Sequence, residues 1–438
     1  MFSIPIILGE LLQNLYNSVD ALVVGNFVSR SALAAVSVCS IIANMIIAFF
    51  NGMSVGANVA VSREYGRRNE EGIRRSSSAA FSFAVVLGVV VSALGILLSP
   101  WLLHITGAGT EYFADALTYL RIYLAGLMFT VIYNNGAGIL RAIGDSHTPF
   151  VILAAACTVN IVLDLLFVIA FRMGIRGTAL ATVFSQFLSV SCIYVAIQRK
   201  LGIRCIDFGL LVREGKETVR QICSIGMAAG MQSALVGFSN LFVVRYMNLF
   251  DTASVAGIGI AQRVDKFIVL PVKSFGVTMT TFTSQNYGAA DFRRIRQGKR
   301  QCLLLSLGVT ITLTALVFAA KQPLVSLFST DAQVVAVGVA MTAVLSPMYW
   351  TLAVRDVYVG LLRGYGKTKM PMLLSLLGMV GFRQLFLALT VARGSGIRYI
   401  YLCYPLAWLV TMLLILGYYA AVRNSLPGLG KEEASAEG

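Results

Sequence analysis

Charged side chains are scarce in this sequence of 438 residues. Only 13% of the residues are Asp, Glu, Lys or Arg, whereas 57% are hydrophobic. A soluble domain carries about 25% charged residues, so this chain lacks the polar surface of a water-soluble fold. We therefore expect an all-α polytopic membrane protein with about twelve spans of roughly 20 residues each. Spans of that number leave no room for a separate soluble catalytic or nucleotide-binding domain.

Metal-binding and disulfide motifs are also lacking. The chain has two histidines and seven widely separated cysteines, with no CxxC pair. This pattern predicts neither a disulfide framework nor a zinc site, and we expect no cofactor. The net charge of +15 comes from Lys and Arg spread over many short segments. A nucleic-acid-binding protein gathers such residues on one face, so we expect no nucleic-acid partner.

One segment has a partial likeness to a phosphate-binding loop. Residues 364–368 read Gly-Tyr-Gly-Lys-Thr, but Leu361 occupies the position where that motif requires its first glycine. No strand is predicted before it, although the motif follows a strand. We therefore expect no ATP binding.

Apolar runs separated by Gly, Pro and charged clusters predict the spans. They lie at 4–27, 32–62, 77–99, 116–141, 149–171 and 178–198, and then at 221–248, 253–285, 301–320, 334–362, 371–392 and 398–422. We therefore expect a six-helix lobe at 1–200, a cytoplasmic linker at 201–220, a second six-helix lobe at 221–424 and a disordered cytoplasmic tail at 425–438. The first apolar run has neither the basic start nor the cleavage site of a signal peptide.

Lys and Arg are distributed unequally between alternate loops. The loops after the second, fourth, sixth, eighth and tenth spans, with the tail, contain 22 of them, and the other loops contain 6. Because basic residues concentrate in cytoplasmic loops, we expect both termini in the cytoplasm. We place the chain in a prokaryotic cytoplasmic membrane as a multi-pass protein.

The sequence repeats itself at one offset of 222 residues. Residues 62–66 (SREYG) align with 284–288 (SQNYG), and residues 139–149 (ILRAIGDSHTP) align with 361–371 (LLRGYGKTKMP). The tripeptide GIR recurs at the same offset, at 174–176 and 396–398. Two halves of six spans each have the same orientation in the membrane, which is the parallel type of transporter repeat. Transporters of this type bind substrate between or within the halves.

Two carboxylates lie inside predicted spans of the first half. Asp20 and Asp164 each follow a proline at the cytoplasmic start of a helix by fifteen residues, Pro5 and Pro149 respectively. At 1.5 Å per residue both lie roughly 22 Å deep. A charged side chain at such a depth costs about 2.5–3.5 kcal/mol on insertion scales and marks a candidate functional site. The alternative is that both carboxylates only bond neighbouring helices.

Other polar residues accompany these carboxylates at helical spacing. They are Gln13, Tyr16 and Asn17 near Asp20, and Asn160 one turn before Asp164. We expect the two polar faces to meet in one cavity, where desolvation favours the protonated carboxyl. Our hypothesis is that Asp20 and Asp164 alternate between holding a proton and accepting a cation.

The second half has a different and more basic set of polar residues inside its spans. The candidates for a substrate cavity there are Gln262, Arg263, Asp265, Lys266, Asp356 and Arg383. These residues either line a cavity or form internal ion pairs, and the sequence does not decide between the two. Arg245 lies near a helix end, where we expect its side chain to reach toward the membrane surface.

The ordered set of motifs resembles the multidrug and toxic compound extrusion (MATE) family across essentially the whole chain. The residues that carry the resemblance in the first half are 5–25 (PIILGELLQNLYNSVDALVVG), 32–36 (ALAAV), 52–66 (GMSVGANVAVSREYG), 140–145 (LRAIGD) and 160–164 (NIVLD). In the second half they are 259–271 (GIAQRVDKFIVLP), 284–289 (SQNYGA) and 361–366 (LLRGYG).

The resemblance implies two six-helix lobes in a V and export of organic cations, often aromatic, in exchange for H⁺ or Na⁺. It also implies that Asp20, Asn160 and Asp164 form the cation site of the first lobe, with Asn17 as a neighbour and Na⁺ as its one candidate metal ion. A second-lobe sodium site is not expected, because residues 221–248 contain no Asp or Glu and Asp356 is displaced from the family's position. We expect a monomer whose native start lies upstream of Met1.

Two further functions remain as alternatives. A lipid-linked saccharide flippase of the same superfamily would suit the basic second half, although such flippases usually lack a pair like Asp20 and Asp164. A membrane-embedded enzyme would need a cluster of acid, base or metal-binding residues, and the sequence shows none. We therefore expect a transporter and not an enzyme.

Overall fold

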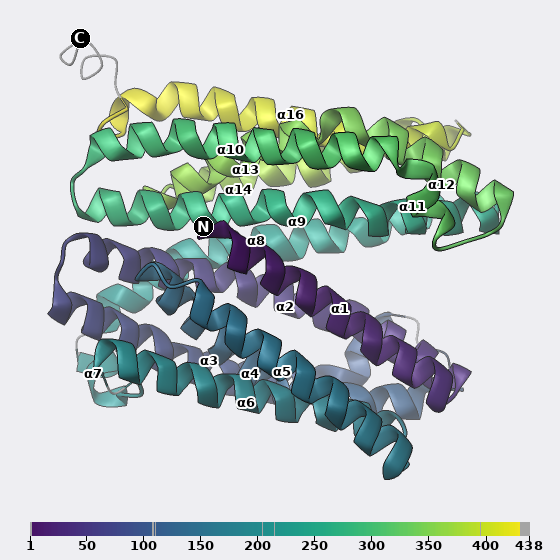
Figure 1. The fold of residues 1–438 in the computed structure, drawn as a ribbon, viewed down its shortest axis with the longest axis horizontal. Coiled ribbons are helices and arrows are strands. Elements are labelled where there is room, and N and C mark those ends of the chain that lie inside the picture. Colours follow the sequence, from purple (N-terminus) through teal and green to yellow (C-terminus); the bar gives the residue numbers. More distant parts are fainter. Residues whose placement is uncertain are drawn as a thin grey trace. The chain divides into compact units, whose positions relative to one another are not determined.

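The computed structural model describes residues 2–106, 109, 111–203, 205–213, 215–394 and 396–429. Over these residues the chain consists of helices and turns, without a strand. It divides into two compact units, which we call the first unit (Met1–Gly230) and the second unit (Met231–Gly438). Figure 1 shows long helices running side by side in each unit. The all-α prediction is confirmed.

The first unit contains six long helices. They are α1 (Ser3–Phe27), α2 (Arg30–Gly66), α3 (Glu70–Ile105), α4 (Phe113–Ala142), α5 (His147–Leu165) with the π-helical η1 (Leu166–Ala170), and α6 (Ile175–Leu201). A short helix α7 (Phe208–Arg213) and the start of α8 (Gly215–Met247) follow, within and beyond the predicted linker.

The second unit contains α8 from residue 231 onward and five further long helical segments. They are α9 (Thr252–Gly288), α10 (Phe292–Ala319) with α11 (Lys321–Ser326), α12 (Ala332–Leu345) continued by η2 (Ser346–Met348) and α13 (Tyr349–Gly364), α14 (Lys369–Leu376) continued by the π-helical η3 (Leu377–Phe382), α15 (Arg383–Leu389) and η4 (Val391–Arg393), and α16 (Arg398–Val422) with η5 (Arg423–Ser425).

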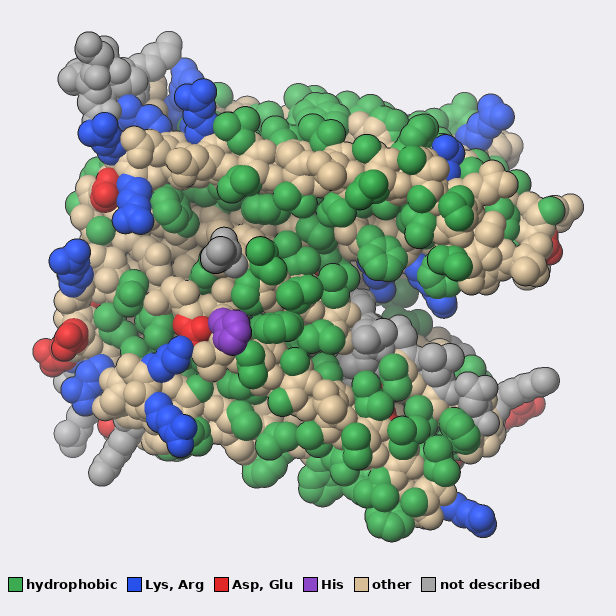
Figure 2. Space-filling view, viewed as in Figure 1, with side chains coloured by type: hydrophobic (Ala, Val, Ile, Leu, Met, Phe, Trp, Pro, Cys, Tyr) green, Lys and Arg blue, Asp and Glu red, His purple; other side chains and the backbone are tan. Residues whose placement is uncertain are grey.

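Ten helical segments of the described residues are long and apolar enough to cross a membrane. Helices α1 and α9 are also long, but α9 carries Arg263, Asp265, Lys266 and Lys273 and is less apolar. Figure 2 shows hydrophobic side chains along the lengths of the helices and Lys and Arg mainly toward their ends. This distribution suits a hydrocarbon core bounded by water. The total of twelve spans stays a prediction.

The 222-residue offset recurs in the capping of equivalent helices. Ser29 caps α2 by accepting from the backbone N–H of residue 32, and Asp251 caps α9 by accepting from that of residue 254. Asn69 and Asp291 cap α3 and α10 in the same way. Such caps satisfy backbone donors that have no partner within the helix. The repeat is therefore a repeat of local structure as well as of sequence.

The same offset relates close contacts in the core of each unit. A Cβ at Gly138 on α4 would lie 3.0 Å from the carbonyl oxygen of Ser54 on α2. At the equivalent position on α13, a Cβ at Gly360 would lie 2.3 Å from the carbonyl oxygen of Gly276 on α9. Small residues let helix backbones approach closely where the lipid gives no hydrophobic drive for packing. Helices α4 and α13 thus occupy equivalent central positions in their units.

Helix ends and the tail differ from the expected boundaries. Helix α3 starts at Glu70, seven residues before the predicted span, and α10 starts at Phe292, nine residues before its span. Backbone hydrogen bonding continues through these charged turns, where hydropathy has already fallen. The predicted disordered tail also starts too early, because Leu426 is buried and the hydroxyl of Tyr365 donates to the carbonyl of Pro427 at 2.8 Å. Residues 430–438 lie outside the described part.

Candidate functional site

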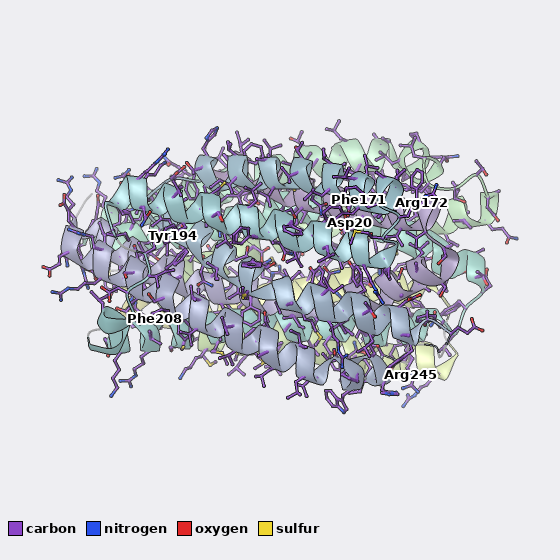
Figure 3. All side chains as sticks on the ribbon, turned by 90° about the horizontal axis from the view of Figure 1, so that it is seen from below. Asp20, Phe171, Arg172, Tyr194, Phe208 and Arg245 are labelled. Carbon is purple, nitrogen blue, oxygen red and sulfur yellow. The ribbon has the colours of Figure 1, made fainter. Side chains whose placement is uncertain are left out.

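The two carboxylates predicted from the sequence meet inside the first unit. Asp20 on α1 is 6% exposed, and Asp164, one residue before the end of α5, is completely buried. Their carboxyl groups lie within hydrogen-bonding distance of each other. Figure 3 shows Asp20 toward the end of the molecule that carries Phe171 and Arg172, away from Tyr194 and Phe208. The structure thus brings together two residues that are 144 positions apart in the sequence.

The protonation state of this pair decides whether the contact is attractive. Apart from the Asp20 carboxyl, no group of the described residues forms a hydrogen bond with either carboxyl oxygen of Asp164. Two ionised carboxylates in contact repel each other, and a proton held by one turns the repulsion into a hydrogen bond. A hard cation lying between them would compensate the charge in the same way, because such ions prefer oxygen ligands. The pair is therefore suited to exchange a proton for a cation.

Asn160 completes the oxygen-rich face of α5. It lies one helical turn before Asp164, is 1% exposed, and neither its amide oxygen nor its amide nitrogen has a hydrogen-bond partner among the described residues. Buried polar groups are normally hydrogen-bonded, so an unpaired amide beside two carboxyls marks a place where a partner is missing. The carbonyl oxygen of Asn160 could serve as a third ligand for Na⁺.

The remaining candidates of the first half contribute less to this description. Gln13 is half-buried on α1. The side chains of Tyr16 and Asn17 lie outside the described part of the chain. Their membership of the site stays a prediction.

Sequence reasoning missed two tyrosines on α4 that face the carboxylates. Tyr119 and Tyr123 stack with ring centroids 6.1 Å apart, and both hydroxyls lie close enough to Asp20 to sense its charge. The hydroxyl of Tyr123 also contacts the side chain of Gln186 on α6. The signal that could have found them is their spacing of four residues, which places both on one helix face.

In the second unit, three of the predicted residues join one polar network. The amide of Gln262 on α9 donates to the hydroxyl of Tyr404 on α16 at 2.8 Å. Arg383 on α15 lies over the ring of Tyr404, with its guanidinium carbon 5.7 Å from the ring centroid. Asp265, one turn after Gln262, accepts a hydrogen bond of 2.6 Å from the hydroxyl of Tyr349 on α13. Aromatic rings therefore lie between the half-buried acid Asp265 and the buried base Arg383 of this unit.

The other three predicted residues have different surroundings. Arg263 and Lys266 are surface-exposed on α9, and the guanidinium of Arg263 lies 5.9 Å from the ring centroid of Phe328. Asp356 accepts hydrogen bonds of 2.6 and 2.9 Å from the guanidinium of Arg355. The sequence left open whether these residues line a cavity or form internal ion pairs, and Asp356 forms an ion pair.

Comparison with known proteins identifies the family. The MatE family model matches residues 5–166 and 228–388, which together make up most of the chain. The chain belongs to the MatE family. The two matched segments end at 166 and 388, which are 222 residues apart, so the family model finds the same repeat as the sequence itself.

Relatives of this MatE protein are similar over nearly their whole length. The probable multidrug resistance protein YpnP of Bacillus subtilis is 28% identical over 402 residues, covering 91% of this chain and 89% of the relative. The probable multidrug resistance protein YoeA of the same organism is 25% identical over 432 residues, covering 96% and 93%.

A solved structure shares the fold. It is described as the outward-facing conformation of a multidrug resistance MATE family transporter, and it is 21% identical, with a TM-score of 0.87 over 96% of this chain and 94% of that one. With its long apolar helices, this MatE protein is a multi-pass membrane protein.

Proposed function

We propose that the chain is a secondary active antiporter that exports cationic or amphipathic small molecules in exchange for H⁺ or Na⁺. The observation that carries the proposal is the buried contact between Asp20 and Asp164, in which no described group other than Asp20 contacts the carboxyl oxygens of Asp164 by a hydrogen bond. Burying such a pair in a membrane protein costs free energy. A role in exchanging a proton for a cation explains why the chain contains it. Relatives named as multidrug resistance proteins support export as the direction.

The proposed cycle uses only side chains of the first unit for coupling. Entry of one H⁺ or Na⁺ from outside removes one of the two negative charges of the pair and with it the repulsion, and its release to the cytoplasm restores two repelling carboxylates. Because the two states differ in charge, each favours a different arrangement of α1 and α5, and the ion gradient biases the equilibrium between them. We place the protein in a prokaryotic cytoplasmic membrane as a monomer.

The test is reconstitution into liposomes with a fluorescent organic cation as the transported compound. A pH jump and a Na⁺ jump, applied separately, identify the coupling ion in the wild-type protein. We expect Asp20→Asn and Asp164→Asn to reduce gradient-driven transport to the level of empty liposomes, because neither amide can release a proton or carry the charge.

Asp115→Asn is the matched control, because this acid lies exposed in the first turn of α4. We expect it to transport at the wild-type rate. An Asp20→Asn protein that exchanges substrate at the normal rate would contradict the proposal. If neither gradient moves the cation in the wild-type protein, the saccharide-lipid flippase becomes the better hypothesis.

A further inference from the structure

Among the described residues of the second unit, Arg383 is a buried cation without a counter-anion. Arg383 is only 2% exposed, and among the described residues no carboxylate forms an ion pair with it. Its Nη2 donates to Oγ of Ser239 at 2.7 Å, and the ring of Tyr404 covers one face. Its Nε–H has no acceptor in the described part of the chain. Buried charges are normally paired and hydrogen-bonded. This guanidinium therefore has a hydrogen-bond donor, Nε–H, and a positive charge that the described residues do not pair.

The polar groups next to Arg383 are hydrogen-bond donors, and none of those described accepts from its Nε–H. Oγ of Ser239, on α8, already accepts from Arg383 and from Nε2 of Gln384, the latter at 2.9 Å. A hydroxyl that accepts two hydrogen bonds still has its own hydrogen to donate, and no described group accepts it. An oxyanion is the ligand class that accepts from a guanidinium edge and a hydroxyl together.

The surroundings favour an oxyanion carried on an aromatic molecule. Arg383 follows the π-helical η3 directly, and π-helical turns frequently mark functional sites. The ring of Tyr404 lies 6.4 Å from that of Trp408, which in turn lies 5.3 Å from that of Tyr349. Trp408 and Tyr349 are buried in the core, whereas Tyr404 is partly exposed, so the ring of Tyr404 is the one suited to contact another aromatic group.

Building on the export function proposed above, we propose that Arg383 and Ser239 form a subsite for an acidic oxygen group, such as a carboxylate, on an aromatic substrate. In a zwitterionic substrate, the acid would then be bound in the second unit while the coupling ion is bound in the first. Arg383 would contact the substrate directly, and Gln384 would position Ser239.

A matched pair of dyes tests this subsite. Rhodamine 110 carries a free carboxylate, and rhodamine 123 is its methyl ester with the same aromatic core. Binding of both is measured by fluorescence polarisation with purified protein in phosphatidylcholine nanodiscs. We expect the wild-type protein to bind the acid more tightly than the ester. We expect Arg383→Gln to weaken binding of the acid by about tenfold or more and that of the ester far less.

The variants separate recognition from folding. Arg383→Lys keeps the charge but loses the planar fork, so we expect an intermediate loss for the acid alone. Arg245→Gln removes an exposed arginine of the same unit and should change neither affinity. Arg383→Lys also answers the question if Arg383→Gln does not fold.

Three outcomes would overturn the subsite. They are equal wild-type affinities for the two dyes, an acid preference that survives in the Arg383 variants, and loss of the preference in nanodiscs containing anionic phosphatidylglycerol, which would assign the site to a lipid headgroup. None of these affects gradient-driven export of the ester, which tests the proposed function separately.

Discussion

At the scale of single residues, equivalent positions of the two halves hold side chains of opposite character. In the alignment of the two halves at the offset of 222 residues, Phe242 corresponds to Asp20 and Phe386 corresponds to Asp164. The second unit therefore repeats the helices that carry the carboxylates but replaces both acids by phenylalanine. Its half-buried Asp265 and its buried Arg383 lie at positions without charged counterparts in the first half. One scaffold thus carries a pair of carboxylates in one unit and a different polar network in the other.

Asp145 provides a prediction about pH at the residue scale. It follows the end of α4 and forms an ion pair with Lys200 at the end of α6, and its carboxyl also accepts from the backbone N–H of Thr148 at 3.0 Å. Burial raises the pKa of the Asp145 carboxyl, but the hydrogen bonds from Lys200 and Thr148 lower it more, so its pKa lies below the ordinary 3.8. The ionised form is therefore the one that stabilises the fold.

We expect Asp145→Asn to lower the stability by about 1 kcal/mol at neutral pH. Because the folded-state pKa is depressed, this contribution is complete above the unfolded pKa and is lost as the pH falls through the folded pKa. The difference in thermal midpoint between wild type and variant, measured in detergent, should therefore be constant from pH 7 to about 5 and shrink below about 4. Glu111→Gln, at an exposed acid, should show no difference. A gap that persists at low pH would contradict the assignment.

A site residue could be predicted from the sequence where its side chain is of a type that is rare inside a membrane span. Asp20, Asp164 and Asn160 were found because ionisable and amide groups are costly within an apolar span. Tyr119 and Tyr123 were missed because tyrosine is common in membrane helices and only packing shows which ring faces a carboxylate. For the same reason the sequence did not distinguish Arg383, which is buried, from Arg263, which is exposed.

At the scale of helices, the repeat predicted the order of the elements better than their lengths. Alignment at one offset anticipated equivalent turns, and Gly144 and Gly366 indeed both adopt positive φ, at 90° and 82°. Hydropathy gave the apolar centres of the helices, but their charged first turns belong to the same hydrogen-bonded elements. The π-helical segments η1 and η3 were not predicted, because their extra residue leaves no compositional signal.

The contact between α9 and α13 gives a prediction at this scale. A Cβ at Gly360 would lie 2.3 Å from the carbonyl oxygen of Gly276, so Gly360→Ala forces the two backbones apart. We expect a loss of about 1–3 kcal/mol, as for overpacking of a core, seen as a lower thermal midpoint. Gly308→Ala on α10 is the control, because a Cβ there has nothing within 4 Å. It should be neutral or slightly stabilising, and equal losses in both variants would refute the packing argument.

At the scale of the molecule, the basic loops gather at one end of each unit. In the first unit, Arg74 donates to the carbonyl of Gly202 at 3.4 Å, and Lys200 pairs with Asp145. The turns after α2, α4 and α6 therefore lie together. In the second unit, Arg296 donates to the carbonyl of Gly428 at 3.1 Å, which joins the turn after α9 to the end of the chain. These are the segments in which Lys and Arg are abundant.

The positive-inside rule then predicts that these ends face the cytoplasm. Single cysteines at Glu70 and Arg300, both exposed in the basic segments, should react with a membrane-impermeant maleimide in right-side-out vesicles only after permeabilisation. Cysteines at Glu111 and Thr252, exposed at the opposite ends, should react at once. The signal of the wild-type protein, whose Cys192 is exposed, is subtracted. Immediate labelling at Glu70 but not at Glu111 would mean that the first unit has the opposite orientation in the membrane. Opposite results at Glu70 and Arg300 would contradict a parallel repeat, because the two halves of six spans each would then not share one orientation.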